Sequence, residues 1–257
     1  MQQVADKRVL LGVPVSVFSR QQAVAFLDDA VSQRKHVKVA FANAHALTIA
    51  AHNRDLRDSL KEFCVFNDGL GVDIASRIMF GHRFPDNLNG TDFIPYYLTR
   101  SQHGLRIYLL GGTPEVVETA AAWFRSQYPR HEIVGMHQGY ISDKDDAGIC
   151  ADISAAQADI VLVSMGNPIQ ERWIARNAEA TDARVLLGVG ALLDFVSGRV
   201  PRAPQWVRTL RCEWIYRLVL EPKRLWRRYL IGNVVFLASV LRDRLTTVGV
   251  ENTPSVR

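Results

Sequence analysis

The segment RIYLLGGTPEVVETAAAWFRSQYPRHEIVGMH, residues 106–137, contains in miniature the order of elements that decides the fold. RIYLLGG (106–112) is a continuous apolar run that ends in two glycines, which is typical of a buried strand. A helix is predicted from Pro114 to about Tyr128, and EIVGMH (132–137) follows as a second strand. A strand, a covering helix and another buried strand indicate a parallel βαβ unit.

The same alternation extends to both sides of this segment. Further strands are predicted at VKVAF (37–41), CVF (64–66), DIVLVSMG (159–166) and RVLLGVG (184–190). One long helix is predicted through HALTIAAHNRDLRDSLKEF (45–63), another from about Lys144 to Gln157, and a third from Pro168. We therefore expect residues 1–200 to form an α/β domain, a Rossmann-like and mostly parallel sheet with helices on both faces.

The last quarter of the chain differs from the rest in charge. From Arg199 to Arg244 there are 11 lysines and arginines and 3 acidic residues, a local net charge of +8 in a chain whose total is +5. Two helices are predicted, Pro204 to Leu220 and a second from Glu221–Pro222 onward, because proline is tolerated at a helix start. We expect residues 201–245 to be a basic, aromatic-rich helical appendage and residues 246–257 to be disordered. Such a charge suits phosphates, a membrane surface or nucleic acid.

Features that would place the chain in a membrane or outside the cell are missing. The longest apolar run, Tyr229 to Leu241, has 13 residues. It is too short to span a bilayer, but it can lie in the bilayer interface beside its arginines. The N-terminus has no signal-peptide pattern, and the three cysteines form no CxxC pair, which favours reduced thiols in the cytoplasm.

Several catalytic motifs are also missing. Gly188–Val189–Gly190 lacks the third glycine of a dinucleotide-binding loop, and no Walker lysine, GxSxG or HExxH is present. The run DKDD (143–146) contains a DxD, the pattern by which some sugar transferases bind metal. It follows Ser142 at a predicted helix start, where acidic residues complement the helix dipole, so capping is favoured over metal binding. No metal or cofactor is predicted.

Two strand-to-helix turns share one design. GGTPE (111–115) and GNPIQE (166–171) each place a capping candidate, Thr113 or Asn167, before a proline, and Gln170 occupies the capping-box position. Simple helix capping explains either turn alone. Two such turns at one sheet edge favour a nucleotide, because helix N-termini bind phosphate.

Three polar residues near predicted strand ends are candidates for chemistry. Asp68, in VFNDGLG, is placed as a general base, although N-D-G is also a hairpin signal; the helix pattern after it argues against a hairpin. Asp194 lies in the apolar stretch GALLDFVSG, where it caps backbone amides or accepts a hydrogen bond from a ligand hydroxyl such as a ribose. Asn43 ends the strand at 37–41 and either caps the next helix or faces the cleft.

The order of motifs resembles one protein family. FANAHAL, FNDGLGV, NGTDF, LLGGTPE, GNPIQERW, GVGALLDFVSGRVPRAPQW and EWIYRLVLEPKRLWRRYLIGN follow one another from about Leu11 to Leu241. This order is similar to that of the WecG/TagA/CpsF glycosyltransferases. The resemblance implies an inverting, metal-independent enzyme that transfers a sugar from a UDP-sugar to a polyprenyl-diphosphate-linked saccharide. The resemblance also implies exopolysaccharide or cell-envelope polysaccharide biosynthesis as the pathway, with N-acetylmannosamine, its uronic acid or glucose as the donor sugar.

The resemblance also assigns roles to residues. Asp68 is the expected base, Asp194 lies on the nucleotide side, and Phe41 departs from the family by standing where a threonine is expected. The remaining expected substrate-binding residues are Asn43, Thr91, Asp92, Gly111, Gly112, Gly166, Asn167 and Gln170. Those expected to bind the acceptor diphosphate are Arg202, Arg217, Arg224 and Arg227. The appendage is expected to hold the protein on the anionic cytoplasmic face of the cell membrane, as a monomer or a homo-oligomer.

Two other functions are consistent with the residues alone. One is another Rossmann-type nucleotide-dependent enzyme, which the broken glycine signature disfavours. The other is a basic nucleic-acid-binding protein, which a sequence pI of about 9.3 allows. The aromatic residues of the appendage alternate with long aliphatic ones at helical spacing, which suits lipid or core better than base stacking. We therefore do not expect nucleic acid to be a partner.

Overall fold

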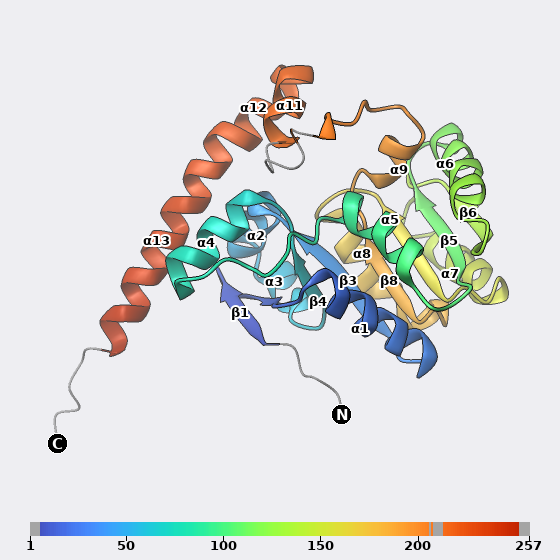
Figure 1. The fold of residues 1–257 in the computed structure, drawn as a ribbon, viewed down its shortest axis with the longest axis horizontal. Coiled ribbons are helices and arrows are strands. Elements are labelled where there is room, and N and C mark those ends of the chain that lie inside the picture. Colours follow the sequence, from blue (N-terminus) through green and yellow to red (C-terminus); the bar gives the residue numbers. More distant parts are fainter. Residues whose placement is uncertain (1–5, 206, 208–212, 252–257) are drawn as a thin grey trace.

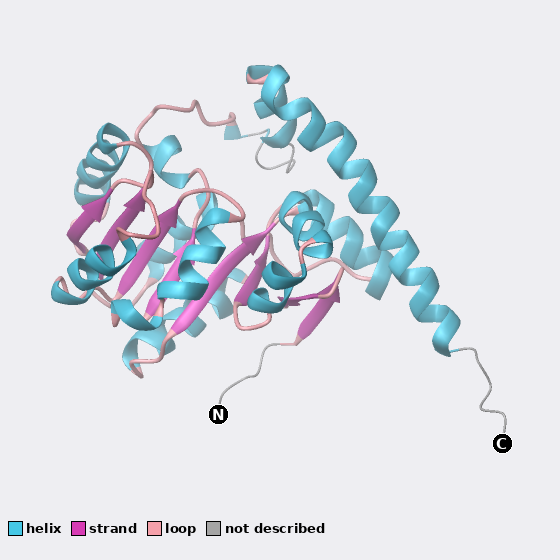
Figure 2. Ribbon diagram, turned by 180° about the vertical axis from the view of Figure 1, so that it is seen from behind, coloured by secondary structure: helices cyan, strands magenta, loops and turns pink. Residues whose placement is uncertain are grey.

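The fold is an eight-stranded sheet between two layers of helices (Figures 1 and 2). A computed structural model of the 257-residue chain describes residues 6–205, 207 and 213–251. The strand order is β1-β2-β4-β3-β8-β7-β5-β6, and only β1 and β2 pair antiparallel. The strands are β1 Lys7–Leu10, β2 Val13–Ser16, β3 Val37–Ala42, β4 Cys64–Asn67, β5 Arg106–Gly111, β6 Glu132–His137, β7 Ile160–Ser164 and β8 Val185–Gly188. The predicted α/β class is confirmed.

Alternate side chains of each central strand enter different cores. In β5, Tyr108 and Leu110 face one layer of helices, whereas Ile107 and Leu109 face the other, and all four are buried. The first layer holds α2 Ala44–His52, α3 Arg54–Leu60, α4 Leu70–Phe80, α7 Asp146–Ala155 and α8 Ile169–Asn177. The second holds α1 Arg20–Ser32, α5 Gly90–Arg100, α6 Pro114–Gln127 and α9 Leu192–Val196. Burial on both faces explains why these strands are continuous apolar runs.

Some local predictions differ from the structure. The single helix predicted at 45–63 is two helices, because the Asn53 side chain accepts a hydrogen bond from the Leu56 amide and starts α3. Asn167 does not cap α8; Pro168 occupies the cap position without a side-chain bond. The hairpin β1–β2, which turns through Leu11 and Gly12 at positive φ, was not predicted. Thr113 caps α6 as expected, by accepting from the Val116 amide.

The appendage consists of several helical pieces and one long helix. The described parts are α11 Glu213–Leu220, α12 Pro222–Trp226, the π-helical turn η2 Arg227–Ile231 and α13 Gly232–Glu251. Residues 208–212 of the predicted first helix lie outside the described part of the chain. The expected boundary at residue 245 falls within α13, which continues to Glu251.

The long helix α13 packs on the α/β body. It lies against α2 and α4, and its Phe236 and Val240 are each only 1% exposed within the first core (Figure 1). Burying two large apolar side chains in this way contributes a few kcal/mol of stability, at about 1.5–3 kcal/mol each. The appendage is therefore joined to the domain through a shared core.

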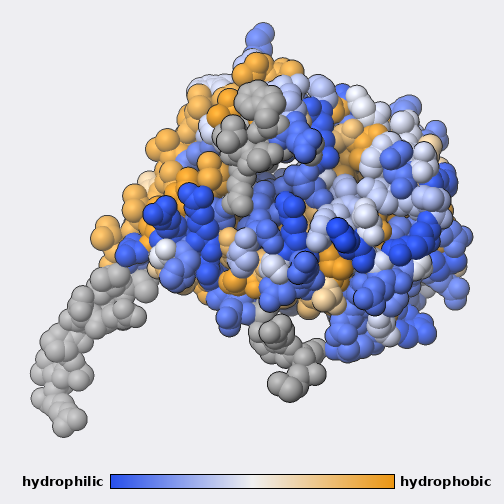
Figure 3. Space-filling view, viewed as in Figure 1, coloured by the Kyte–Doolittle hydropathy of each residue, from blue (hydrophilic) through white to orange (hydrophobic). Residues whose placement is uncertain are grey.

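The outer side of the appendage is apolar and exposed. Figure 3 shows this side as a hydrophobic band along the upper left edge of the molecule. We call it the apolar face, and it comprises Ile215, Val219, Leu220, Trp226, Leu230, Ile231, Val234, Val235, Leu241 and Leu245. Exposed apolar patches of this kind mark interaction surfaces.

Candidate functional site

A cavity of about 1170 Å³ lies between the carboxyl ends of the parallel strands and the appendage. Its floor comes from the turns that follow β3, β4, β7 and β8, and its roof from α11, η2 and α13. Open parallel sheets bind ligands at this edge. The sequence-predicted residues that line it are Asn43, Asp68, Thr91, Asp92, Gly112, Gly166, Asn167, Gln170, Asp194 and Arg217.

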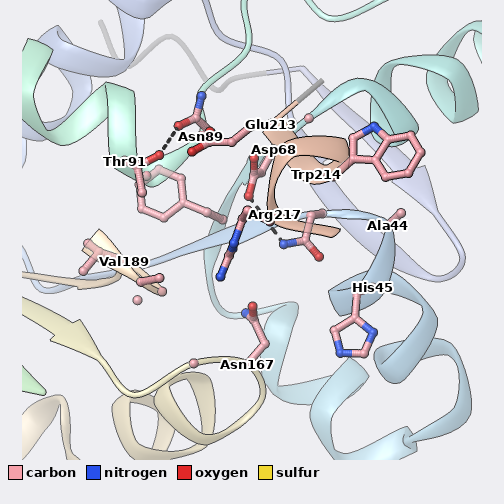
Figure 4. A pocket seen from close by; sticks show the side chains of 18 of the residues that line it. Ala44, His45, Asp68, Asn89, Thr91, Asn167, Val189, Glu213, Trp214 and Arg217 are labelled. Carbon is pink, nitrogen blue, oxygen red and sulfur yellow. Dashed lines mark hydrogen bonds between the residues drawn. The ribbon is translucent and has the colours of Figure 1, made fainter. Parts of the chain in front are cut away.

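Asp68 is held on a short, well-anchored loop after β4. Its amide donates to the Ala42 carbonyl at 3.0 Å, and the Gly69 amide donates to Asn87 Oδ1 at 2.7 Å. Gly69 has φ of +90°, which glycine adopts readily, and α4 begins at Leu70. The hairpin alternative for N-D-G is therefore wrong, because a helix follows. The carboxylate faces the cavity (Figure 4).

Asn43 fills both of the roles that the sequence left open. Its Oδ1 accepts from the Ala46 amide at 3.0 Å and so caps α2. Its Nδ2 lies 3.4 Å from Asp68 Oδ2, at the edge of hydrogen-bond distance (Figure 4). The strand-end asparagine thus orients the carboxylate while it starts the helix beside it.

The two glycines of the turn after β5 have different roles. A Cβ on Gly111 would lie 2.3 Å from the Ser164 carbonyl oxygen, so this glycine permits close packing of β5 on β7. Gly111 is not among the residues that line the cavity. Gly112 does line it, but its amide donates to the Ser164 carbonyl at 3.3 Å, and its carbonyl accepts from Gly139.

The Gln170 side chain supports the floor of the cavity and is only 1% exposed. Its Oε1 accepts from the amides of Gly166, at 3.1 Å, and Gly190, at 3.0 Å. Its Nε2 donates to the Gly188 carbonyl at 2.8 Å and to Glu171 Oε1 at 2.9 Å. One side chain therefore fixes the turns after β7 and β8. The predicted capping box is not formed, because Gln170 accepts from the Gly166 amide and the cap position is held by Pro168, which has no N–H.

Three predicted residues are engaged in ion pairs. Asp194 lies 3.6 Å from Arg199, and both residues line the cavity. Asp194 therefore faces the cavity as a member of an ion pair. Arg202, expected on the acceptor diphosphate, instead donates to the Asp92 carboxylate and to the Thr91 carbonyl. Arg202 does not line the cavity, and it ties the start of the appendage to the start of α5.

The other appendage arginines divide between the roof and the surface. Arg217 points into the cavity that Asp68 and Asn167 line, with its guanidinium 5.5 Å from the Phe195 ring (Figure 4). Arg227 is exposed, lies over the Trp226 ring at 5.3 Å, and does not line the cavity. The side chain of Arg224 lies outside the described residues.

Sequence reasoning missed several cavity residues. His45 and Glu213 line it, as do Tyr140 and Ile169, which are 69% and 59% exposed although apolar or aromatic. Tyr140 follows β6 and Ile169 follows β7, so both stand after strand ends, the signal that identified Asp68. Glu213 was overlooked because it reads as an ordinary first-turn acid of a helix.

The DKDD run lies away from this cavity. Asp143 pairs with Arg176 at 2.8 Å, and Asp145 accepts from the Ser142 amide and hydroxyl at 2.7 and 2.8 Å. Asp145 occupies the N-cap position of α7 without a side-chain capping bond, and its carboxylate instead holds the turn that precedes the helix. Within the described ranges no group of three potential metal-ligating side chains is found.

No helix in the described part of the chain has the length and apolarity that crossing a membrane requires.

Comparison with known proteins identifies the family of the chain. Residues 8–249 match the model of the glycosyl transferase WecG/TagA/CpsF family. A Bacillus subtilis (strain 168) protein, N-acetylglucosaminyldiphosphoundecaprenol N-acetyl-beta-D-mannosaminyltransferase, is 31% identical over 202 residues, which are 78% of this chain and 77% of that protein. The chain, with its strand-end carboxylate under a helical roof, belongs to the WecG/TagA/CpsF family of glycosyltransferases.

Proposed function

We propose that this enzyme transfers a sugar, with inversion and without a metal, from a UDP-sugar to a saccharide on polyprenyl diphosphate. The observation that carries the proposal is the position of Asp68, a carboxylate that opens into the cavity beneath Arg217. The Bacillus subtilis relative is named for an acceptor of this kind. The product would serve exopolysaccharide or cell-envelope polysaccharide biosynthesis.

In the proposed reaction Asp68 accepts the proton of the attacking acceptor hydroxyl. The hydroxyl oxygen forms a bond to the anomeric carbon of the donor, and the bond from that carbon to UDP breaks with its electron pair leaving on the diphosphate. One displacement inverts the anomeric centre. Asn43 holds the carboxylate toward the cavity through its 3.4 Å contact.

The negative charge that builds on UDP needs positive partners. Arg217 and Arg199 line the cavity, and guanidinium groups match phosphate oxygens well. We assign Arg217 to a diphosphate, and Asp194 beside Arg199 to the nucleotide side. These arginines support a mechanism in which no divalent cation is needed.

The apolar face supports a peripheral position on the cytoplasmic side of the cell membrane. It stands on the helices that roof the cavity, in a segment, residues 199–244, whose net charge is +8. Apolar side chains in the interface and arginines at the headgroups act together on anionic lipid. This orientation brings the cavity to the depth at which a lipid diphosphate is presented.

The test is a donor screen that follows UDP release in the presence of N-acetylglucosaminyl diphosphate on a short polyprenyl chain. UDP-N-acetylmannosamine is the first donor, because the relative is named for that sugar, and its uronic acid and UDP-glucose follow. We expect release that requires acceptor and persists in EDTA. If no UDP-sugar is consumed, or if EDTA abolishes release and Mn²⁺ or Mg²⁺ restores it, the proposed function or its metal independence is wrong.

A further inference from the structure

Glu171 is a buried acid directly beneath the cavity. It is 4% exposed in the first turn of α8, next to Gln170. Its Oε2 is inaccessible and has no hydrogen-bond partner, and none of the ion pairs among the described residues involves it. A buried, unpaired carboxyl is costly, so its retention beside the site requires a reason.

A one-way chain of hydrogen bonds fixes the role of each atom around it. The Gly166 and Gly190 amides are donors, so the Gln170 atom that accepts from both must be its oxygen. Gln170 Nε2 therefore donates to Glu171 Oε1, and that oxygen acts as an acceptor. Asn167 Nδ2 donates to the same Oε1.

The end of this chain is a ligand-facing atom. With Nδ2 committed to Glu171, Asn167 keeps Oδ1 for the cavity that it lines (Figure 4). An amide oxygen accepts from a hydroxyl or an N–H and is repelled by a phosphate oxygen. The part of the donor that meets Asn167 is therefore a hydroxyl- or N–H-bearing part, the nucleoside or the sugar.

We propose that Glu171 is a positioning residue for the donor: its Oε1 fixes the Asn167 amide so that Oδ1 accepts a hydrogen bond from the UDP-sugar. This inference rests on the proposed function. Glu171 itself does not line the cavity, and it acts only through Asn167.

The surroundings of Glu171 favour its uncharged form. Burial raises the pKa of the Glu171 carboxyl, opposed by hydrogen bonds that include those from Gln170 and Asn167. The charged residues on α8 and on the elements packed against it, β3, α3 and the short helix η1 Glu179–Thr181, are Lys38, Arg54, Asp55, Arg57, Asp58, Arg172, Arg176 and Glu179. None of them pairs with Glu171.

The experiment compares Glu171→Gln and Glu171→Leu, with the exposed Glu179→Leu as matched control. Glutamine keeps the accepting oxygen, so its KM for UDP-N-acetylmannosamine should stay within about twofold of wild type. Leucine should raise donor KM about 3- to 10-fold, the worth of one neutral hydrogen bond, and leave acceptor KM unchanged. A glutamine variant as impaired as the leucine variant would overturn the proposal.

A double-mutant cycle tests the route through Asn167. If Glu171 acts only by orienting that amide, Glu171→Leu should have no further effect on donor affinity in an Asn167→Ala background. Affinity is measured by calorimetry, so turnover is not needed. Additive losses would overturn the inference alone, whereas a wild type that binds no UDP-sugar would overturn the proposed function and the inference with it.

A pH series supplies a readout that does not depend on substrate. Because the folded pKa is raised, the stability that protonated Glu171 contributes is present below the ordinary glutamate pKa of about 4.3 and is lost as pH rises through the folded value. The difference in Tm between Glu171→Gln and wild type should therefore increase, in favour of the variant, by at least about 3 °C between about pH 5 and pH 8.5. A constant difference over that range would refute the neutral acid, even if the leucine variant failed to fold.

Discussion

Replacing Asp68 by asparagine exchanges one carboxylate oxygen for an amide nitrogen at nearly constant volume. The bonds that hold its loop, Asp68 N to Ala42 O and Gly69 N to Asn87 Oδ1, do not involve the carboxylate. The carboxylate contact with Asn43 Nδ2 is 3.4 Å long, and an asparagine oxygen can replace it. We expect the free energy of unfolding to change by less than about 1 kcal/mol.

The effect on turnover should be much larger. An amide cannot take the acceptor proton, and a positioned general base contributes about 10²- to 10⁴-fold. The lower limit corresponds to about 2.7 kcal/mol of barrier. Because the base contacts the acceptor hydroxyl, affinity for UDP should remain within about twofold of wild type.

The assay combines UDP release, calorimetric UDP binding and a thermal melt. Asp194→Asn is the matched control, since it removes a second carboxylate from the same cavity and should act on donor KM through Arg199. A folded Asp68→Asn enzyme that turns over within about threefold of wild type would exclude the base role. A loss of kcat in Asp194→Asn equal to that in Asp68→Asn would also exclude the base role of Asp68.

Three further outcomes follow from the fold. Arg202→Ala and Asp92→Ala should each lower the free energy of unfolding by about 1 kcal/mol or less. In denaturant melts, the double variant should lose no more free energy of unfolding than either single variant. Additive losses would mean that the ion pair does not form. Val234→Asp on the apolar face should weaken co-sedimentation with anionic liposomes at least about tenfold. Val9→Asp is the control, since Val9 is also an exposed valine, and it should leave liposome binding unchanged. Equal binding by the two variants would exclude the apolar face as a membrane-binding surface. Phe236→Ala should cost about 3–5 kcal/mol in a single melting transition, and an unchanged main transition would show that α13 docks independently of the body.

The sequence predicts best where burial dictates composition. β3, β5, β7 and β8 are buried on both faces, so their residues form apolar runs with clear ends. Asp68 was identified for the same reason, because it follows such a run. The break at Asn53 was not predicted, since an asparagine within a helical pattern either caps a new helix or points to solvent, and only packing decides.

The appendage illustrates what patterns of charge leave out. Arg202 and Arg217 carry the same charge in the same basic segment, yet one binds Asp92 and the other enters the cavity. Their partners are set by distant residues of α5 and α9, which local sequence does not contain. Glu171 is a similar case. An acid at the third position of a helix is expected to face solvent and to interact favourably with the helix dipole, whereas the structure buries Glu171.

The cavity has its floor and its roof at opposite ends of the chain. Asn43 and Asp68 lie in the first third of the sequence, whereas Trp214, Arg217 and Phe236 belong to the last fifth. During translation Asp68 therefore leaves the ribosome well before the residues that cover it have been made. Domains fold from the N-terminus as they emerge, so this cavity is completed only when synthesis reaches α13. A chain interrupted before residue 213 would carry Asp68 with no roof over it.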